Sequence, residues 1–343
     1  MSSLAEPTTA AVRPPFSRAD QQGASTTRFG GVWLTGLVAA LAWAAAAAYI
    51  AWWPGQMVMA DPTLLIQLTA GASLVLLAVS LVGTRAPALL NALQPIGPWF
   101  IALAVILIAW EAVTAKLGIL PRPFFSTPQG ILNVYFQDFP KLSESLLHSL
   151  RLLAIGYFVG AITGFLTGIA IGWWKVAGYW LHPVLRFIGP LPATAWLPIA
   201  FFIFPSSFSA STFLVALASG VPVTILTWSG IASVNKDYFD IARTMGASQA
   251  FLVRKVAVPA ALPHVFVGLF MGLGSAFAVL VVAEMLGVKA GLGWYLQWAQ
   301  GWAAYDNMYA ALALMAVMCS SLVTLLFWVR DRTLAWQKEL VRW

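Results

Sequence analysis

The stretch "NKDYFDIARTMGASQAFLVRKVAVPAALP", Asn235 to Pro263, concentrates charge in a chain that has little of it elsewhere. Residues 187–235 on one side and residues 256–283 on the other contain no charged side chain. The 20 residues in between contain six, which are Lys236, Asp237, Asp240, Arg243, Arg254 and Lys255. This pattern is typical of a water-exposed loop that joins two segments buried in lipid.

The composition of the whole chain agrees with a lipid environment. Of its 343 residues, 60% are hydrophobic and only 9% are charged, whereas a soluble domain has roughly 25% charged residues. Apolar runs about as long as a transmembrane helix recur along the chain. They are continuous, unlike the alternating segments of about ten residues that form membrane barrels. The sequence therefore predicts an all-α polytopic membrane protein.

The apolar runs predict eight transmembrane helices. They are Val32–Trp53, Leu64–Val82, Trp99–Lys116, Leu152–Trp174, Val184–Phe204, Ser211–Ser233, Val265–Gly287 and Met308–Val329. The first run is too long for a signal peptide and ends in "YIAWWPG" rather than in a cleavage signature. The uncharged residues 187–235 are too many for one helix, and the turn-forming "FPSSFSAS", Phe204 to Ser211, divides them.

Lysine and arginine are distributed unequally between the two sides that eight crossings define. The side with both termini holds Arg13, Arg18, Arg28, Arg85, Lys175, Arg186, Lys236, Arg243, Arg254, Lys255, Arg330, Arg332, Lys338 and Arg342. The other side holds Lys116, Arg122, Lys141, Arg151 and Lys289. Since positive side chains concentrate in cytoplasmic loops, we expect both termini and the loop 234–258 in the cytosol. Residues 1–28, rich in Ser, Thr and Pro, predict a disordered cytoplasmic tail, and residues 337–343 a short C-terminal one.

Within the charged loop, "YFDIARTMGA" predicts two or three helical turns. We expect Asp237 to be the N-cap of this helix and Gly246 to end it. Pro259 and Pro263 then shape the entry into the next span. On this pattern alone, a short amphipathic helix lying on the membrane surface is an equally valid interpretation.

The order of residues in the loop resembles the cytoplasmic signature of the permease subunits of bacterial ABC importers. That signature reads Glu-Ala-Ala, three residues, Gly, nine residues, Ile-x-Leu-Pro. This chain has Asp240-Ile241-Ala242, three residues, Gly246, nine residues, and Val256-Ala257-Val258-Pro259. Ile241 departs from the family pattern, because it adds bulk where a close contact is expected.

Flanking segments resemble the nitrate/sulfonate/taurine-type branch of this family. They are "LPRPFFSTPQGIL" (120–132), "LPATAWLPIAFFIF" (191–204) and "VVAEMLGVKAGLGWYL" (281–296). The resemblance covers Trp99 to Trp336 and six of the eight spans. It predicts a six-helix permease core at residues 96–336, preceded by two accessory transmembrane helices at residues 29–95. The turn "FPSSFSAS" departs from the usual text of the family, so we expect a different loop facing the binding protein.

The resemblance implies a transport subunit of a bacterial cytoplasmic (inner) membrane. Its loop would be the coupling helix that binds a separate ABC ATPase subunit, through Asp240, Ala242, Arg243, Gly246, Ala247 and Pro259. That ATPase would bind ATP and Mg²⁺, and an extracytoplasmic solute-binding protein would deliver the solute to a homodimer of this chain. The implied solute is a small anion or organic acid such as nitrate, sulfonate, taurine or bicarbonate.

No catalytic or metal-binding set is recognisable in the sequence itself. A phosphate-binding loop needs Gly-Lys followed by Ser or Thr, and none of the seven lysines follows a glycine. The three histidines, His148, His182 and His264, lie far apart in the sequence. The net charge of +7 resides in short loops between spans, which favours membrane topology over nucleic-acid binding. We therefore expect no enzyme activity and no cofactor in this chain.

Two features inside the spans bear on mechanism. Gly156, Gly160, Gly164, Gly168 and Gly172 recur every four residues and form one stripe on a helix. The stripe is either a sliding surface near the transport path or static packing within the subunit.

Glu111 and Glu284 are carboxylates within spans, where charge is costly. Glu284 is a candidate gate or pathway residue, an inter-helix hydrogen-bond partner, or a simple interfacial carboxylate.

Two other classes of protein compete with the permease interpretation. A self-contained secondary transporter would need an ion-coupling site near the midplane and, usually, internal repeats with broken helices. The sequence offers only one or two candidate carboxylates and no convincing repeat. A membrane-embedded enzyme would need a reactive set of side chains, and none is recognisable.

Overall fold

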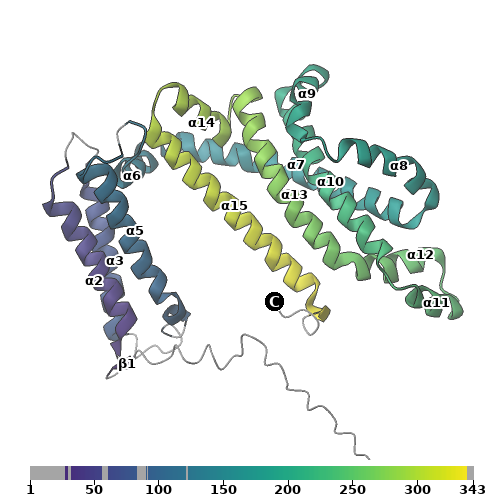
Figure 1. The fold of residues 1–343 in the computed structure, drawn as a ribbon, viewed down its shortest axis with the longest axis horizontal. Coiled ribbons are helices and arrows are strands. Elements are labelled where there is room, and N and C mark those ends of the chain that lie inside the picture. The colour runs from purple at the N-terminus through teal and green to yellow at the C-terminus, as the bar shows by residue number, and fades with distance from the viewer. Residues whose placement is uncertain are drawn as a thin grey trace, which may run out of the picture. The chain divides into compact units, whose positions relative to one another are not determined.

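The computed structural model describes residues 28–29, 32–55, 61–82, 90, 92–120 and 123–337. Most of the predicted tail at residues 1–28 and residues 338–343 lie outside these ranges. The chain divides into an N-terminal unit (residues 1–122 with 127–129) and a C-terminal unit (residues 123–126 and 130–343). Described strands are confined to one antiparallel pair, β1 (Arg28–Phe29) and β2 (Val32–Trp33); the other elements are helices (Figure 1).

The N-terminal unit is built on three apolar helices. Its elements are α2 (Leu34–Trp52), α3 (Thr63–Val82), η2 (Gln94–Ile96), α5 (Gly97–Glu111) and the π-helical turn η3 (Ala112–Lys116). The Ser73 hydroxyl on α3 donates to the Ala40 carbonyl on α2 at 2.8 Å. The Trp43 indole donates to the Phe100 carbonyl on α5 at 3.0 Å. The predicted accessory pair thus packs with the first helix of the predicted core, and a functional division at residue 95 stays a prediction.

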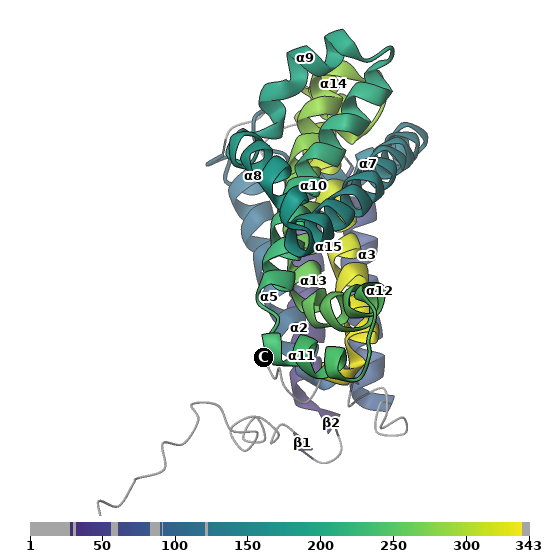
Figure 2. The ribbon, with the colours of Figure 1, turned by 90° about the vertical axis from the view of Figure 1, so that its right-hand side faces the viewer.

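The remaining helices, apart from the first two residues of α6, belong to the C-terminal unit. They are α6 (Pro128–Gln137), α7 (Phe139–Trp173), α8 (Lys175–Ile188), η4 (Ala193–Trp196), α9 (Leu197–Ile203), α10 (Ser207–Ala232), α11 (Lys236–Thr244), α12 (Gln249–Phe251), η5 (Leu252–Ala257), α13 (Val258–Gly287), α14 (Leu292–Gly301), α15 (Tyr305–Thr333) and η6 (Ala335–Gln337). Within this unit, α11 and α12 lie at one end, here termed the coupling end, and α9 and α14 lie at the other (Figures 1 and 2).

The central contact of the C-terminal unit joins α7 and α10 through the glycine stripe. A methyl group added to Gly156 would meet Val215, one on Gly164 would meet Gly220, and one on Gly172 would meet Ile231. The contacting residue numbers rise together on both helices, so α7 and α10 run parallel. The five glycines thus pack against a neighbouring helix of the same chain and let the two backbones approach closely.

Because α7 and α10 run parallel, the chain that joins the end of α7 to the start of α10 must return along the full length of these helices. The helices α8 and η4–α9 make this return, with a bend of 90° between them. Three contacts show that this segment runs antiparallel to α10. Going along the chain, His182 contacts Trp228, Gly189 lies beside Val221, and Phe204 contacts Phe213. The prediction of one continuous helix at Val184–Phe204 is therefore wrong, because this crossing is broken in the middle.

This arrangement agrees with the predicted number of crossings. Seven described helical segments are long and apolar enough to cross a membrane, and the bent pair, counted as one span, brings the number to eight. The fold is that of an all-α polytopic membrane protein, as the sequence predicts.

The glycine contact predicts intolerance to bulk on α7. A methyl group on Gly164 would lie 2.5 Å from the Gly220 carbonyl oxygen, so Gly164→Leu must push the two helices apart. We expect a loss of about 1–3 kcal/mol, measured as a lower thermal-unfolding midpoint and a lower yield in detergent. Leu166→Ile, two residues further on the exposed side of α7, is the control and leaves both values unchanged. Equal yields and midpoints for the two variants would refute the packing account.

Candidate coupling site

The helix α11 begins at a side-chain cap. The Asn235 side chain accepts a hydrogen bond from the Asp237 amide at 3.1 Å. Asn235 rather than Asp237 is therefore the N-cap, which corrects the sequence prediction by two residues. Asp237 instead lies in the first turn and Arg243 in the last, where each charge stabilises the helix dipole. The helix starts at this position because Asn satisfies an amide that the first turn leaves without a partner.

The same helix ends in a Schellman motif built on two residues of the family signature. The Gly246 amide donates to the Arg243 carbonyl at 2.9 Å, and the Ala247 amide donates to the Ala242 carbonyl at 3.0 Å. Gly246 has φ of +82°, a left-handed conformation that glycine adopts without strain. The spacing of Ala242 and Gly246 is thus the spacing that this helix ending requires, and Gly246 ends the helix as the sequence predicts.

One face of α11 is apolar and exposed in the single chain. Tyr238, Ile241 and Met245 are spaced by three and four residues and share this face, and the Met245 side chain is 83% exposed. Asp240 and Arg243 form an ion pair of 3.1 Å beside it, with both side chains more than half exposed. Such a pair stabilises a fold by at most about 0.5 kcal/mol. Apolar side chains gathered on one exposed helix face indicate a binding surface.

The opposite face of α11 is anchored to the spans. The Phe239 ring packs edge-on against the Trp173 indole at the end of α7, with 5.6 Å between ring centroids. Both join a cluster whose buried members are Ile231, Ala257 and Ala261. A helix of nine residues is marginal by itself, so this cluster holds α11 in place. It joins α11 to the ends of α7 and α10 and to the start of α13.

The chain after Gly246 re-enters the membrane as one continuous helical segment. Ser248 caps α12, and α12, η5 and α13 follow one another without a gap. η5 is a π-helical turn directly before α13, whose second residue is Pro259. Proline lacks an amide hydrogen and clashes with the carbonyl four residues earlier, and the wider turn accommodates both effects. Pro259 is thus the point at which the loop joins α13, and Arg254 and Lys255 remain exposed on the turn before it.

Glu284 lies at the end of α13 away from the coupling end, in a junction of three helices. Its buried carboxylate accepts hydrogen bonds from the Ser149 hydroxyl on α7 (2.8 Å) and from the Gly293 amide at the start of α14 (2.9 Å). The Ser149 oxygen in turn accepts from the Leu292 amide at 2.8 Å. Gly291, with φ of +116°, leaves the space that the carboxylate fills. This α14 junction makes Glu284 an inter-helix hydrogen-bond partner in this conformation.

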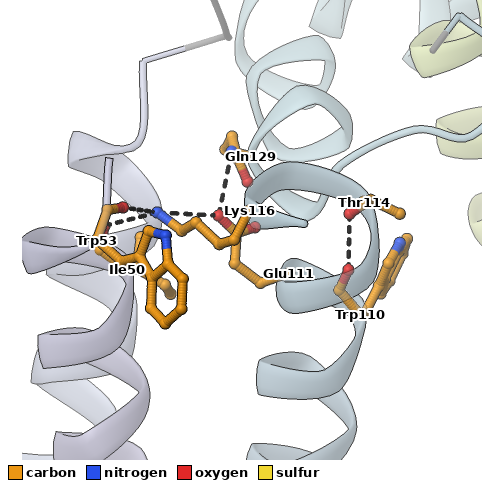
Figure 3. Close-up of polar contacts among 7 residues, drawn as sticks. All are labelled: Ile50, Trp53, Trp110, Glu111, Thr114, Lys116 and Gln129. Atoms are coloured by element: carbon orange, nitrogen blue, oxygen red, sulfur yellow. Dashed lines mark hydrogen bonds and ion pairs between the residues drawn. The ribbon is translucent and has the colours of Figure 1, made fainter. Parts of the chain in front are cut away.

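Glu111 belongs to a buried polar cluster in the N-terminal unit (Figure 3). Lys116 Nζ lies 3.7 Å from Glu111 Oε1, and both side chains are buried. The same ammonium donates to the Ile50 and Trp53 carbonyls at the end of α2, and the Gln129 amide donates to Glu111 at 3.4 Å. A cation at a helix C-terminus is favourable, so Lys116 links α2 to α5 instead of facing solvent.

The sequence offered no local signal for several of these partners. Ser149, Lys116 and Phe239 acquire their roles from residues far away in the chain, namely Glu284, Ile50 and Trp173. Aromatic residues at a span end and in the adjoining loop are the one weak local signal of the Phe239–Trp173 contact.

Comparison with known proteins shows the family of the chain. Residues 152–333 match the family described as binding-protein-dependent transport system inner membrane component. The nitrate import permease protein NrtB of Synechococcus elongatus is 29% identical over 73% of this chain and 91% of its own length. The bicarbonate transport system permease protein CmpB of the same organism is 32% identical over 57% of this chain and 66% of its own length. A crystal structure of an amino acid ABC transporter is 19% identical, with a TM-score of 0.49, over 59% of this chain and 98% of that one.

Seven or eight apolar crossings and a helical loop with one anchored and one exposed face define a polytopic membrane protein. The chain belongs to the binding-protein-dependent transport system inner membrane component family. It is a permease subunit of an ATP-driven ABC importer, of the branch that includes nitrate permeases. It is a transport component rather than a catalyst.

The α14 junction predicts a stability loss when its hydroxyl is removed. Ser149→Ala leaves the buried Leu292 amide unpaired and removes one donor from Glu284, which costs about 1–3 kcal/mol. Thermal unfolding in detergent measures this as a lower midpoint. The control is Ser143→Ala on the same helix, where the hydroxyl donates to the Pro140 carbonyl at an exposed position and its loss costs at most about 0.5 kcal/mol. An unchanged midpoint for Ser149→Ala would contradict the described junction.

Proposed function

We propose that α11 and the turn after it form the coupling helix through which this permease binds a separate ABC ATPase subunit. The observation that carries this proposal is the exposed apolar face of Tyr238, Ile241 and Met245 on a helix whose other face is fixed to the spans. A surface that must bind a soluble partner needs exposed apolar side chains surrounded by polar ones. Asp240 and Arg243 supply the polar rim.

The proposed partner binds and hydrolyses ATP, with Mg²⁺ in its own site. No lysine of this chain follows a glycine, as a phosphate-binding loop requires. Closure of the ATPase around ATP would displace α11. Since Phe239 and Trp173 join α11 to α7, and η5 joins α12 to α13, the displacement reaches the membrane-crossing helices directly. Gly246 and Ala247 let the chain turn sharply between the two anchors, and Pro259 sets its entry into α13.

The proposed solute is a small anion or organic acid of the nitrate, sulfonate, taurine or bicarbonate class. The support is the similarity to permeases named for nitrate and for bicarbonate import. An extracytoplasmic binding protein would deliver this solute to two copies of the chain. The copies would lie in a bacterial inner membrane, with the coupling end and both termini in the cytosol. Glu284, at the opposite end, would hold α14 in place as part of the outer gate.

The test is a pair of substitutions at the most exposed residue of the binding face. Met245→Asp places a charge where the partner would bury an apolar side chain, and a loss of about 3 kcal/mol weakens binding more than a hundredfold. Met245→Leu preserves the apolar contact and serves as the control. Co-purification of the ATPase with each full-length variant measures the difference, and we expect its loss for Met245→Asp alone.

Two readouts separate this outcome from misfolding. The yield and thermal midpoint of Met245→Asp should equal those of the wild type, because the side chain contacts solvent in the isolated chain. Undiminished co-purification and solute-stimulated ATP hydrolysis in Met245→Asp would refute the coupling-helix proposal.

A further inference from the structure

The broken crossing places irregular backbone in the middle of the membrane. Its two helices, α8 and η4–α9, are separated by residues 189–192, which include Pro190 and Pro192. Gly189 lies beside Val221, near the centre of the 26-residue helix α10. At 1.5 Å per residue, α10 is about 39 Å long and spans the hydrocarbon core, which is about 30 Å thick. The break therefore lies near the midplane.

The backbone polar groups of this break are incompletely paired. The Gly189 and Leu191 amides donate to carbonyls of α8. In the described chain, however, no hydrogen bond reaches the carbonyl oxygens of Gly189, Pro190 and Leu191. An unpaired backbone group in hydrocarbon costs several kcal/mol, so irregular backbone at this depth must face protein or water.

The break is also uncovered in the single subunit. Pro190, Leu191, Pro192 and Ala195 are exposed, Leu191 at 42%. Lipid cannot satisfy three carbonyl groups, and the described residues of this chain leave them open. What covers them must therefore be a second copy of the chain, water between two copies, or both.

We propose that residues 189–195 line the solute path and face the second copy across it. This inference rests on the proposed function, because it assumes the path between two copies. Residues 189–195 carry no charged side chain themselves, and the exposed Arg186 lies one turn before the break, in the last turn of α8. A path must bind its solute weakly enough to release it. Water bound to the backbone carbonyls and the Thr194 hydroxyl would donate hydrogen bonds to an anionic solute, which the carbonyl oxygens themselves cannot do. Discrimination among solutes would then reside with the binding protein.

The experiment measures whether a cysteine at the break meets water at the midplane. The single native cysteine, Cys319, is first removed by Cys319→Ser. In this full-length protein with the ATPase bound, Ala195→Cys is compared with Leu166→Cys. Leu166 is 59% exposed on α7. It lies at about the depth of the break, because nearby Gly164 contacts Gly220, and Gly189 of the break lies beside the next residue, Val221. The probe is a small, permanently charged thiosulfonate reagent, applied to right-side-out and inverted vesicles with and without ATP.

We expect the reagent to modify Ala195→Cys about tenfold faster than Leu166→Cys on at least one side, because the reactive thiolate forms in water and not in lipid. Leu191→Cys serves as a second variant in case Ala195→Cys assembles poorly. Modification of both break variants at the slow rate of Leu166→Cys would overturn the inference. ATPase co-purification is measured in parallel, and its absence from the unmodified protein would count against the proposed function and not against the position of the path.

Discussion

The close contact between α7 and α10 determines most of the remaining architecture. Glycines on α7 let its backbone approach that of α10, and the register of the contact makes the two helices parallel. Parallel neighbours force the chain between them to cross the membrane once more, and the space beside α10 is filled by α8 and α9. The same register brings Trp173, which ends α7, to the level of Ile231, near the end of α10. That meeting point is where α11 is anchored.

The loop 234–258 combines two surfaces that could not share one face of a helix. Phe239 must remain in the cluster with Trp173 if α11 is to transmit force, while Tyr238, Ile241 and Met245 must remain exposed if it is to bind a partner. The Schellman motif at Ala242 and Gly246 ends the helix where the exposed face ends. The charges that first draw attention to this loop keep it in water and surround the apolar face, and they add little to the stability of the fold.

The elements that depend on local pattern are predictable from the sequence. Continuous apolar runs predict the number of crossings, regular glycine spacing predicts a close helix contact, and Gly246 predicts a helix end. Features that depend on distant partners are not predictable in this way. The break at Gly189–Pro192 lies in an apolar segment whose hydropathy does not reveal an interruption. The parallel arrangement of α7 and α10 is what indicates that α8 and α9 together form one crossing. Lys116 appeared to be a loop charge because nothing local indicates that it caps α2. Asn and Asp are both favoured at the N-cap, so the sequence does not distinguish Asn235 from Asp237. In the structure the helix starts at Lys236, which makes Asn235 the N-cap.

In the proposed mechanism, α11 transmits displacement to α7 through the Phe239–Trp173 contact. Phe239→Ala removes this contact and leaves the exposed face intact, and Phe239→Leu retains apolar bulk as the control. The measurement is solute uptake per ATP hydrolysed in reconstituted vesicles containing the permease, its ATPase and its binding protein. We expect Phe239→Ala to bind the ATPase normally yet to transport about tenfold less solute per ATP, equivalent to about 1.4 kcal/mol of coupling free energy. Wild-type uptake per ATP in Phe239→Ala, at wild-type ATPase binding, would contradict the account.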